Sequence, residues 1–226
     1  MATPYVTILR NVVPSTQDLA AAEMRSRRNP VLVIAGKQTA GRGRTGNLWW
    51  QATRGVAASL AFDLDVVDDT FTLMVGLAVR DAIATATGVT TDLKWPNDIE
   101  LAGSKVGGIL VERAADQVVV GVGLNVYWPD APSGAGAVLG VDPGADLGRV
   151  ISGMWAEAVL DPAARWDRHQ YMAACATVGA QITWDPDGEG RAVDVDERGG
   201  LVVAVGGEQI VLRSGEVRAV RSSGDA

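Results

Sequence analysis

Two arginines stand two positions apart in a glycine-rich segment, Gly41-Arg42-Gly43-Arg44-Thr45-Gly46. A guanidinium group binds carboxylates and phosphates through paired hydrogen bonds, and glycine lets the backbone approach a ligand closely. Arg42 and Arg44 are therefore candidates to bind a polyanionic substrate. The alternative is a basic surface loop without a ligand, which fits less well in an acidic chain where a tryptophan pair lies beside the loop.

The same segment satisfies the pattern G-x-G-x-x-G, and Asp63 or Asp65 follows at about the twenty-residue spacing of a dinucleotide-binding fingerprint. In that fold the glycines follow a strand directly and open a helix whose N-terminus meets the pyrophosphate. Here five residues separate the apolar run 31–35 from Gly41, and residues 47–51 do not begin an amphipathic helix. The context argues against a Rossmann site.

Lysine is rare in this chain, which has seventeen arginines but only three lysines, Lys37, Lys94 and Lys105. Because arginine supplies the general positive charge, a retained lysine is a candidate for a role that needs a compact, flexible ammonium. Chance placement is the alternative, and the surrounding motifs decide between the two.

Four short segments carry the most specific pattern: QTAGRGRTGNLW (38–49), KWPND (94–98), KVGGILVE (105–112) and GVGLN (121–125). In this order they resemble the signature motifs of biotin protein ligases, and the upstream STQ (15–17) resembles the family's Ser-Thr-Asn. One such motif is weak evidence, whereas four collinear motifs are strong. Gln17 stands where the family usually has Asn, and Thr45 and Asn47 replace residues that are often basic. These departures bear on affinity rather than on the reaction.

The resemblance implies ATP-dependent activation of biotin to biotinyl-5'-AMP. Biotin then passes to a lysine of a biotin carboxyl carrier domain of an acyl-CoA or pyruvate carboxylase. The first step brings two anions together, so fixed cations and a metal shared among phosphate oxygens are the expected remedy. The anhydride intermediate needs no protein nucleophile. This agrees with a single cysteine, Cys175, and a single histidine, His169, both expected to be structural.

The resemblance also assigns roles to individual residues. Lys105 and Arg44 are expected to be catalytic. Biotin is expected to contact Ser15, Thr16, Gln38, Gly41, Arg42, Lys105, Gly108 and Gly121. ATP is expected to contact Arg42, Arg44, Trp49, Lys94, Asn97, Asp98 and Asn125, with Asp98 also a ligand of Mg²⁺.

Several of these residues have a structural interpretation as well. Ser15 and Asp18 have the spacing of a helix capping box, and cap and ligand contact are equally supported for Ser15. Pro96-Asn97-Asp98 is typical of an ordinary turn. Trp49 would also suit core packing.

Hydrophobic periodicity predicts an α+β fold with a mixed, largely antiparallel sheet and flanking helices. Strands are expected at 5–12, 31–35, 55–62, 91–94, 105–113 and 117–125, and helices at 16–26, 71–87, 147–160 and 162–175. After residue 178, short strands separated by Gly-rich turns predict a small SH3-like β barrel. The expected division is a catalytic domain at 1–177 and a barrel domain at 178–226.

Composition limits the partners. A net charge of −7 argues against nucleic acid, whose phosphates require a basic surface. No apolar run approaches the ~20 residues that cross a bilayer, and the first residues lack the layout of a signal peptide. One cysteine fits a reducing compartment, so a cytoplasmic location is expected, as monomer or homodimer. Because the chain starts with the catalytic region, it resembles the ligases without an N-terminal DNA-binding domain.

Two alternatives stay open. A lipoate or octanoate ligase or transferase shares the fold, but its arginine-glycine-glycine-glycine loop is missing from the sequence. A non-catalytic biotin-binding module would not need the phosphate-binding cations Arg42, Arg44, Lys94 and Lys105.

Overall fold

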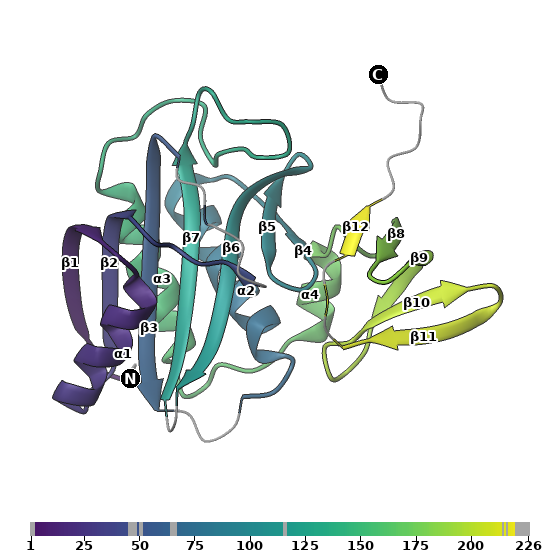
Figure 1. The fold of residues 1–226 in the computed structure, drawn as a ribbon, viewed down its shortest axis with the longest axis horizontal. Helices are drawn as coiled ribbons and strands as arrows, with labels where there is room; N and C mark the ends of the chain where they lie inside the picture. Colours follow the sequence, from purple (N-terminus) through teal and green to yellow (C-terminus); the bar gives the residue numbers. More distant parts are fainter. Residues whose placement is uncertain are drawn as a thin grey trace.

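The computed structural model describes residues 3–44, 49, 52–63, 67–114, 117–213, 215 and 217–219. A large sheet with helices on both faces is followed by a smaller sheet at the C-terminal end (Figure 1). The predicted α+β class, with a largely antiparallel main sheet and a small C-terminal β module, is confirmed. Thr45 and Asn47, two of the departures from the family pattern, lie outside the described residues.

The large sheet has seven strands in the order β1-β2-β3-β7-β6-β5-β4. Within the described ranges β1 and β2 form its one parallel pair, and the other neighbours are antiparallel. The strands are β1 (Val6–Val13), β2 (Val31–Gln38), β3 (Arg54–Asp63), β4 (Asp92–Lys94), β5 (Asp98–Leu101), β6 (Ser104–Ala114) and β7 (Gln117–Tyr127).

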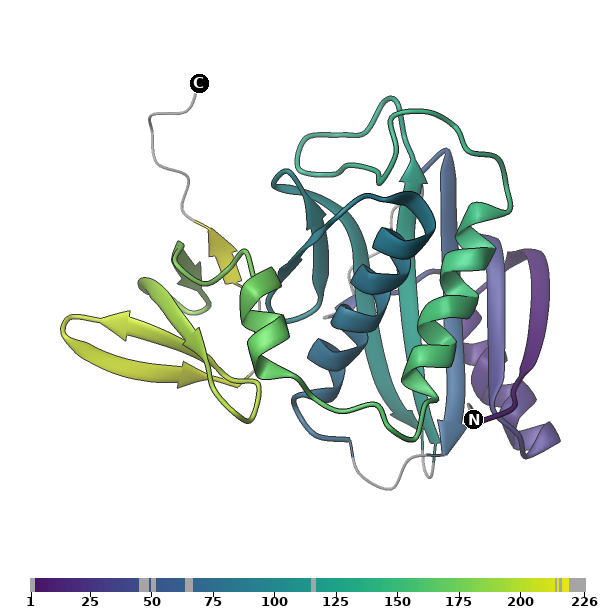
Figure 2. The same ribbon diagram turned by 180° about the vertical axis from the view of Figure 1, so that it is seen from behind.

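Helices cover the two faces unequally. Helix α1 (Thr16–Arg27) lies on one face, and α2 (Phe71–Thr87) and α3 (Leu147–Val159) lie side by side on the other (Figure 2). The apolar run of β2 shows why both faces need cover: Val31 and Val33 join the core beneath α1, whereas Leu32 and Ile34 join the core beneath α2 and α3. Successive side chains of a strand point to opposite faces, so an uninterrupted apolar run indicates a strand buried on both sides.

The structure differs from the prediction at two elements. Strand β5 was not expected, because Pro96-Asn97-Asp98 predicts a turn; the turn is present, and the chain pairs with β4 and β6 immediately after it. The helix predicted at 162–175 is shorter, since α4 spans Arg168–Ala174. Asp167 caps α4 by accepting from the Gln170 N–H, and Asp161 holds a separate turn by accepting from the Ala163 N–H.

The small sheet has the order β11-β10-β9-β8-β12. Its strands are β8 (Gln181–Trp184), β9 (Gly188–Val195), β10 (Leu201–Val205), β11 (Glu208–Leu212) and β12 (Val217–Ala219). One apolar cluster runs from the main sheet into this module, so the proposed boundary at 177/178 divides a shared core and stays a prediction. Among the described helices, none combines the length and the apolar run that crossing a membrane would take.

Trp95 ties the two sheets together. Its side chain is 2% exposed, its indole N–H donates to the Gly199 carbonyl at 2.9 Å, and its backbone N–H donates to the Thr177 hydroxyl at 2.9 Å. The turn that carries Asn97 is therefore fixed from the C-terminal side of the molecule.

We expect Trp95→Phe to lower the free energy of unfolding by about 1–3 kcal/mol, because the buried Gly199 carbonyl loses its partner. Urea unfolding followed by circular dichroism measures the change. Trp166→Phe is the matched control, since the buried indole N–H of Trp166 has no hydrogen-bond partner. Equal destabilisation by the two variants would contradict the role assigned to the Trp95 bond.

Candidate active site

A cleft of about 990 Å³, including the part open to solvent, lies between α1, the middle of the large sheet and the start of β12. Eleven of the predicted site residues line it: Thr16, Gln38, Arg42, Arg44, Trp49, Lys94, Asn97, Asp98, Lys105, Gly108 and Gly121. These come from segments far apart in the sequence, so the structure brings the predicted motifs to one place. Their individual roles stay predictions.

Two lysines flank one carboxylate at the floor of the cleft. Lys105 Nζ lies 2.6 Å from Asp98 Oδ1, and Lys94 Nζ lies 4.0 Å from Asp98 Oδ2 and 3.5 Å from Glu100 Oε1. Strand register explains much of the arrangement, because Lys94 is the cross-strand partner of Asp98, and Lys105 is the partner of Glu100, two residues further along the same strand.

The backbone of Lys105 is held independently of its side chain. Its N–H donates to the Gly134 carbonyl and its carbonyl accepts from the Gly136 N–H, both at 2.9 Å. A Cβ at Gly136 would lie 2.9 Å from the Ser104 Cβ, so the loop can approach Lys105 this closely only without a side chain there.

Arg44 is fixed to the turn before β5. Its Nη1 donates to Asn97 Oδ1 at 3.1 Å, and the Asn97 Nδ2 donates to the Ile109 carbonyl at 3.0 Å. The second bond orients the amide so that its oxygen faces the arginine. This places a guanidinium group close to the two lysines.

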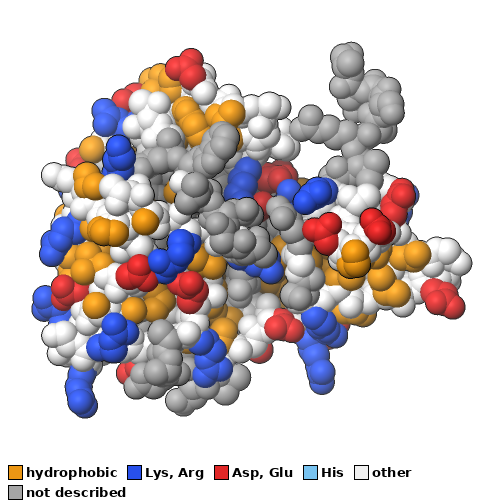
Figure 3. Space-filling view, viewed as in Figure 1, with side chains coloured by type: hydrophobic (Ala, Val, Ile, Leu, Met, Phe, Trp, Pro, Cys, Tyr) orange, Lys and Arg blue, Asp and Glu red, His pale blue; other side chains and the backbone are white. Residues whose placement is uncertain are grey.

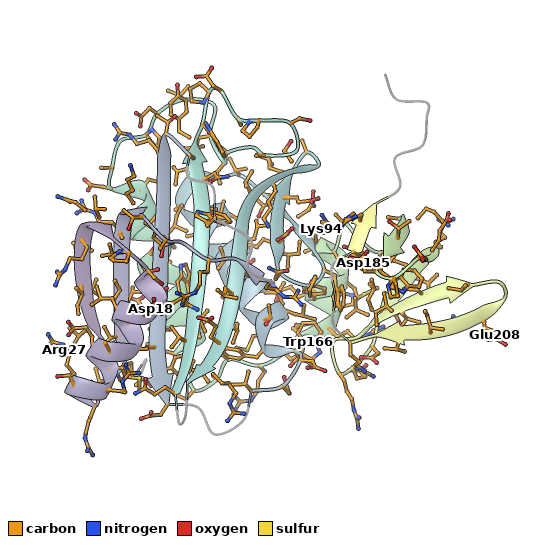
Figure 4. All side chains as sticks on the ribbon, viewed as in Figure 1. Asp18, Arg27, Lys94, Trp166, Asp185 and Glu208 are labelled. Carbon is orange, nitrogen blue, oxygen red and sulfur yellow. The ribbon has the colours of Figure 1, made fainter. Side chains whose placement is uncertain are left out.

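Arg42 is paired with α1. It donates to both carboxylate oxygens of Asp18, at 2.7 and 2.9 Å, and lies 3.7 Å from Glu112. The hydrogen bonds from Arg42 lower the pKa of Asp18, and the same pair raises the pKa of Arg42. Asp18 lies on α1 at one side of this face and Lys94 at the other, next to the small sheet (Figure 4).

Positive charge reaches the surface at the cleft. Lys and Arg side chains are exposed near the middle of this face (Figure 3). In a chain of net charge −7, four cations around one cleft, Arg42, Arg44, Lys94 and Lys105, indicate an anionic ligand.

A chain of hydroxyls and an amide lines the inner wall. The Ser59 hydroxyl donates to Thr16 Oγ1 at 2.7 Å, and the Thr16 hydroxyl lies 3.0 Å from Gln38 Oε1. Ser59 is fully buried and lines the cleft, yet sequence reasoning missed it. The available signal was one polar residue inside the otherwise apolar run 56–62.

Trp49 lies across the glycines of the sheet. A Cβ at Gly123 would be 2.5 Å from its indole ring, and a Cβ at Gly108 would be 3.2 Å from it. The ring therefore packs on bare backbone of β6 and β7 while it also borders the cleft.

Three predicted residues do not line the cleft: Ser15, Gly41 and Asn125. Ser15 caps α1, accepting from the Asp18 N–H at 3.4 Å, which confirms its structural role. Gly41 lies against Gln38 and Trp49. Asn125 is buried, and its Nδ2 donates to the Gly136 carbonyl at 3.0 Å, so it supports the loop that holds Lys105.

Comparison with known proteins gives consistent results. The sequence profile of the Biotin/lipoate A/B protein ligase family matches residues 9–125. The chain is 36% identical to a biotin–[acetyl-CoA-carboxylase] ligase of Mycobacterium tuberculosis over 83% of this chain and 78% of that one. It is 30% identical to the ligase of the same description from Paracoccus denitrificans, covering 82% and 88%.

The fold is also similar to a solved structure. A biotin protein ligase from Aquifex aeolicus, in complex with biotin and ATP, superposes with a TM-score of 0.80 over 96% of this chain and 99% of that one, at 23% identity. At this identity the likeness concerns the fold.

The Arg42–Asp18 pair predicts a pH dependence. A carboxyl whose pKa is lowered in the folded state adds stability above its unfolded pKa and loses that contribution as pH falls through the folded pKa. The stabilisation by this pair is therefore expected at neutral pH and is lost in acid.

An NMR titration of the Asp18 carboxyl tests this. We expect a midpoint below the ordinary aspartate value in the wild type and a return toward it in Arg42→Gln. Arg27→Gln is the control, because Arg27 pairs with Glu23 on the same helix. An Asp18 midpoint that Arg42→Gln leaves unchanged would contradict the assignment.

Proposed function

The chain belongs to the biotin/lipoate A/B protein ligase family, and from this premise we propose how its cleft activates biotin and passes it to a protein lysine. It is a biotin protein ligase. Biotin and ATP give biotinyl-AMP and pyrophosphate, and a carrier lysine then takes the biotinyl group and releases AMP. Similarity to the Mycobacterium tuberculosis ligase over most of the chain is the observation that carries this conclusion.

The cations of the cleft reduce the electrostatic repulsion that opposes the first step. A carboxylate oxygen must attack the α-phosphorus while pyrophosphate leaves, and both reactants are anions. Lys105 and Arg44 are proposed to neutralise the charge that develops around the phosphorus, because preorganised cations stabilise such charge without reorganising. Lys94 and Arg42 would hold the remaining phosphate and carboxylate groups.

In the second step, the lysine amine of the carrier attacks the acyl carbon of the mixed anhydride, the bond to the phosphate oxygen breaks, and AMP leaves. No protein nucleophile takes part. Cys175 fits this scheme, since burial raises the pKa of its thiol and so disfavours the thiolate.

Among the described residues that line the cleft, Asp98 carries the one carboxylate that could bind magnesium. The described residues hold no group of three or more metal-ligating side chains. Mg²⁺ is commonly bound by one or two carboxylates together with substrate phosphates, so Asp98 fits a site completed by the nucleotide. When bound there, Mg²⁺ would reduce the negative charge of the phosphates.

The carrier is proposed to be the biotin carboxyl carrier domain of an acyl-CoA or pyruvate carboxylase. A cytoplasmic location is proposed because the chain has one cysteine and cannot form an internal disulfide. Lipoate ligation is the second candidate, because the description of the matching family includes lipoate protein ligases.

Lys105→Met is expected to lower the rate of biotin-dependent ATP–pyrophosphate exchange by about 10²–10³-fold, the typical loss when one preorganised charge-stabilising group is removed. Transfer of labelled biotin to a purified carrier domain should fall in parallel. Lys37→Met is the matched control, because Lys37 is exposed and lies outside the cleft.

Loss of exchange in Lys105→Met with full activity in Lys37→Met supports the assignment. Biotin binding by the wild type without any exchange would instead indicate a non-catalytic biotin-binding module. Exchange that depends on lipoate or octanoate, and not on biotin, would indicate the second candidate.

A further inference from the structure

Glu100 is a largely buried carboxylate next to the cleft. It lies in β5, its side chain is 15% exposed, and it is not one of the described residues that line the cleft. Among the described residues, Lys94 is the one cation that forms an ion pair with it, and Lys94 Nζ lies 3.5 Å from Glu100 Oε1. A charge that is largely buried is costly unless it is paired, so the role of Glu100 is to be sought in its contact with Lys94.

The strands place Glu100 on the face of the sheet that carries the two lysines of the cleft. Lys94 is the cross-strand partner of Asp98 on β4. Lys105 is the cross-strand partner of Glu100 on β6. Side chains of a strand alternate between its faces, and Ile99, between the two acidic residues, is fully buried in the core on the opposite face. The result is a row of alternating charge: Glu100, Lys94, Asp98 and Lys105.

Within this row, Asp98 has two lysines near it but lies much closer to one of them. Its Oδ1 is 2.6 Å from Lys105 Nζ, whereas its Oδ2 is 4.0 Å from Lys94 Nζ. The nearer carboxylate of Lys94 is that of Glu100, at 3.5 Å. With Glu100 as the partner of Lys94, Asp98 remains paired with Lys105.

The backbone on both sides of Lys94 is held, so the remaining freedom of this residue lies in its side chain. The Leu93 carbonyl accepts from the Ala176 N–H, and the Trp95 N–H donates to the Thr177 hydroxyl, both at 2.9 Å. The side chain of a lysine is a flexible four-carbon stem. Ordering such a stem when a phosphate binds costs conformational entropy, and an ammonium that is already held in place avoids this cost.

We propose that Glu100 is a positioning residue for ATP: it holds the ammonium of Lys94 toward the phosphates of the nucleotide and apart from Asp98. The proposal rests on the proposed function. The sign of the effect distinguishes positioning from a simple effect of charge. A carboxylate near a phosphate site repels the ligand, so removing its charge would strengthen ATP binding if repulsion alone mattered. If Glu100 positions Lys94, removing the charge weakens ATP binding.

The test measures kcat and the KM for ATP in biotin-dependent ATP–pyrophosphate exchange by the full chain. We expect Glu100→Gln, which keeps the shape and removes the charge, to raise the KM for ATP about 3–10-fold, as for the loss of one hydrogen-bonded contact. The KM for biotin should keep its wild-type value. Glu100→Asp keeps the charge but shortens the reach, so it should raise the KM for ATP less than Glu100→Gln does. Glu100→Asp also carries the test if Glu100→Gln fails to fold.

A double-mutant cycle shows whether Glu100 acts through Lys94. Lys94→Met alone should raise the KM for ATP, and adding Glu100→Gln should then change it by less than about twofold, because two residues that serve one contact are not additive. Glu23→Gln is the matched control, since Glu23 is a part-buried glutamate that pairs with Arg27 on α1 and does not line the cleft. It should keep the wild-type KM for ATP, and thermal unfolding followed by circular dichroism checks that each variant folds.

The possible results separate the positioning role from the proposed function. A wild type without biotin-dependent exchange would overturn the proposed function. A wild type that catalyses exchange, together with a KM for ATP that Glu100→Gln lowers or leaves unchanged, would overturn the role of Glu100 alone. The same holds if Lys94→Met keeps the wild-type KM for ATP, or if Glu100→Gln has an equal effect with and without Lys94→Met, because the effect would then not pass through Lys94.

Discussion

Fixed positive charge within an acidic chain is the constraint on which the rest of this structure depends. Flexible cations in water would stabilise a bound phosphate only weakly. Solvent weakens the attraction, and ordering the long side chains costs conformational entropy. In this cleft each of the four cations has a protein partner that limits its position: Asp98 for Lys105, Glu100 for Lys94, Asn97 for Arg44 and Asp18 for Arg42. Under the proposed function, the substrates would meet cations whose positions are already fixed.

The register of the strands also fixes the positions of the site residues relative to one another. Lys94, Asp98 and Gly108 are brought together by register across three adjacent strands, and a shift by one residue would turn the alternating side chains to the other face. Glycines at 108, 121 and 123 keep the floor of the cleft low enough for Trp49, Gln17 and a ligand. The two apolar cores, one beneath α1 and one beneath α2 and α3, keep that sheet in place.

Much of this could be predicted from sequence, and the reasons are physical. Strand β2 was predictable from its uninterrupted apolar run, and α2 from its helical apolar pattern. Burial in the core determines the residue pattern of both elements. Motif resemblance located the cations, since Arg42, Arg44, Lys94 and Lys105 all lie in short, specific segments. Ser59 was missed because one polar residue in an apolar strand has no chemical signature until the fold places it beside Thr16. Val217 was missed for a similar reason: only the tertiary structure shows that the end of the chain borders the cleft.

The link through Trp95 has a consequence for synthesis of the protein. The turn that bears Asn97 and Asp98 is anchored by Gly199, and Gly215 and Val217 form part of the cleft wall. A ribosome that has made the whole large sheet has therefore not yet made a complete cleft. The growing chain acquires this part of the wall only after residue 217 has been made, so the cleft is completed later than the large sheet that forms most of it.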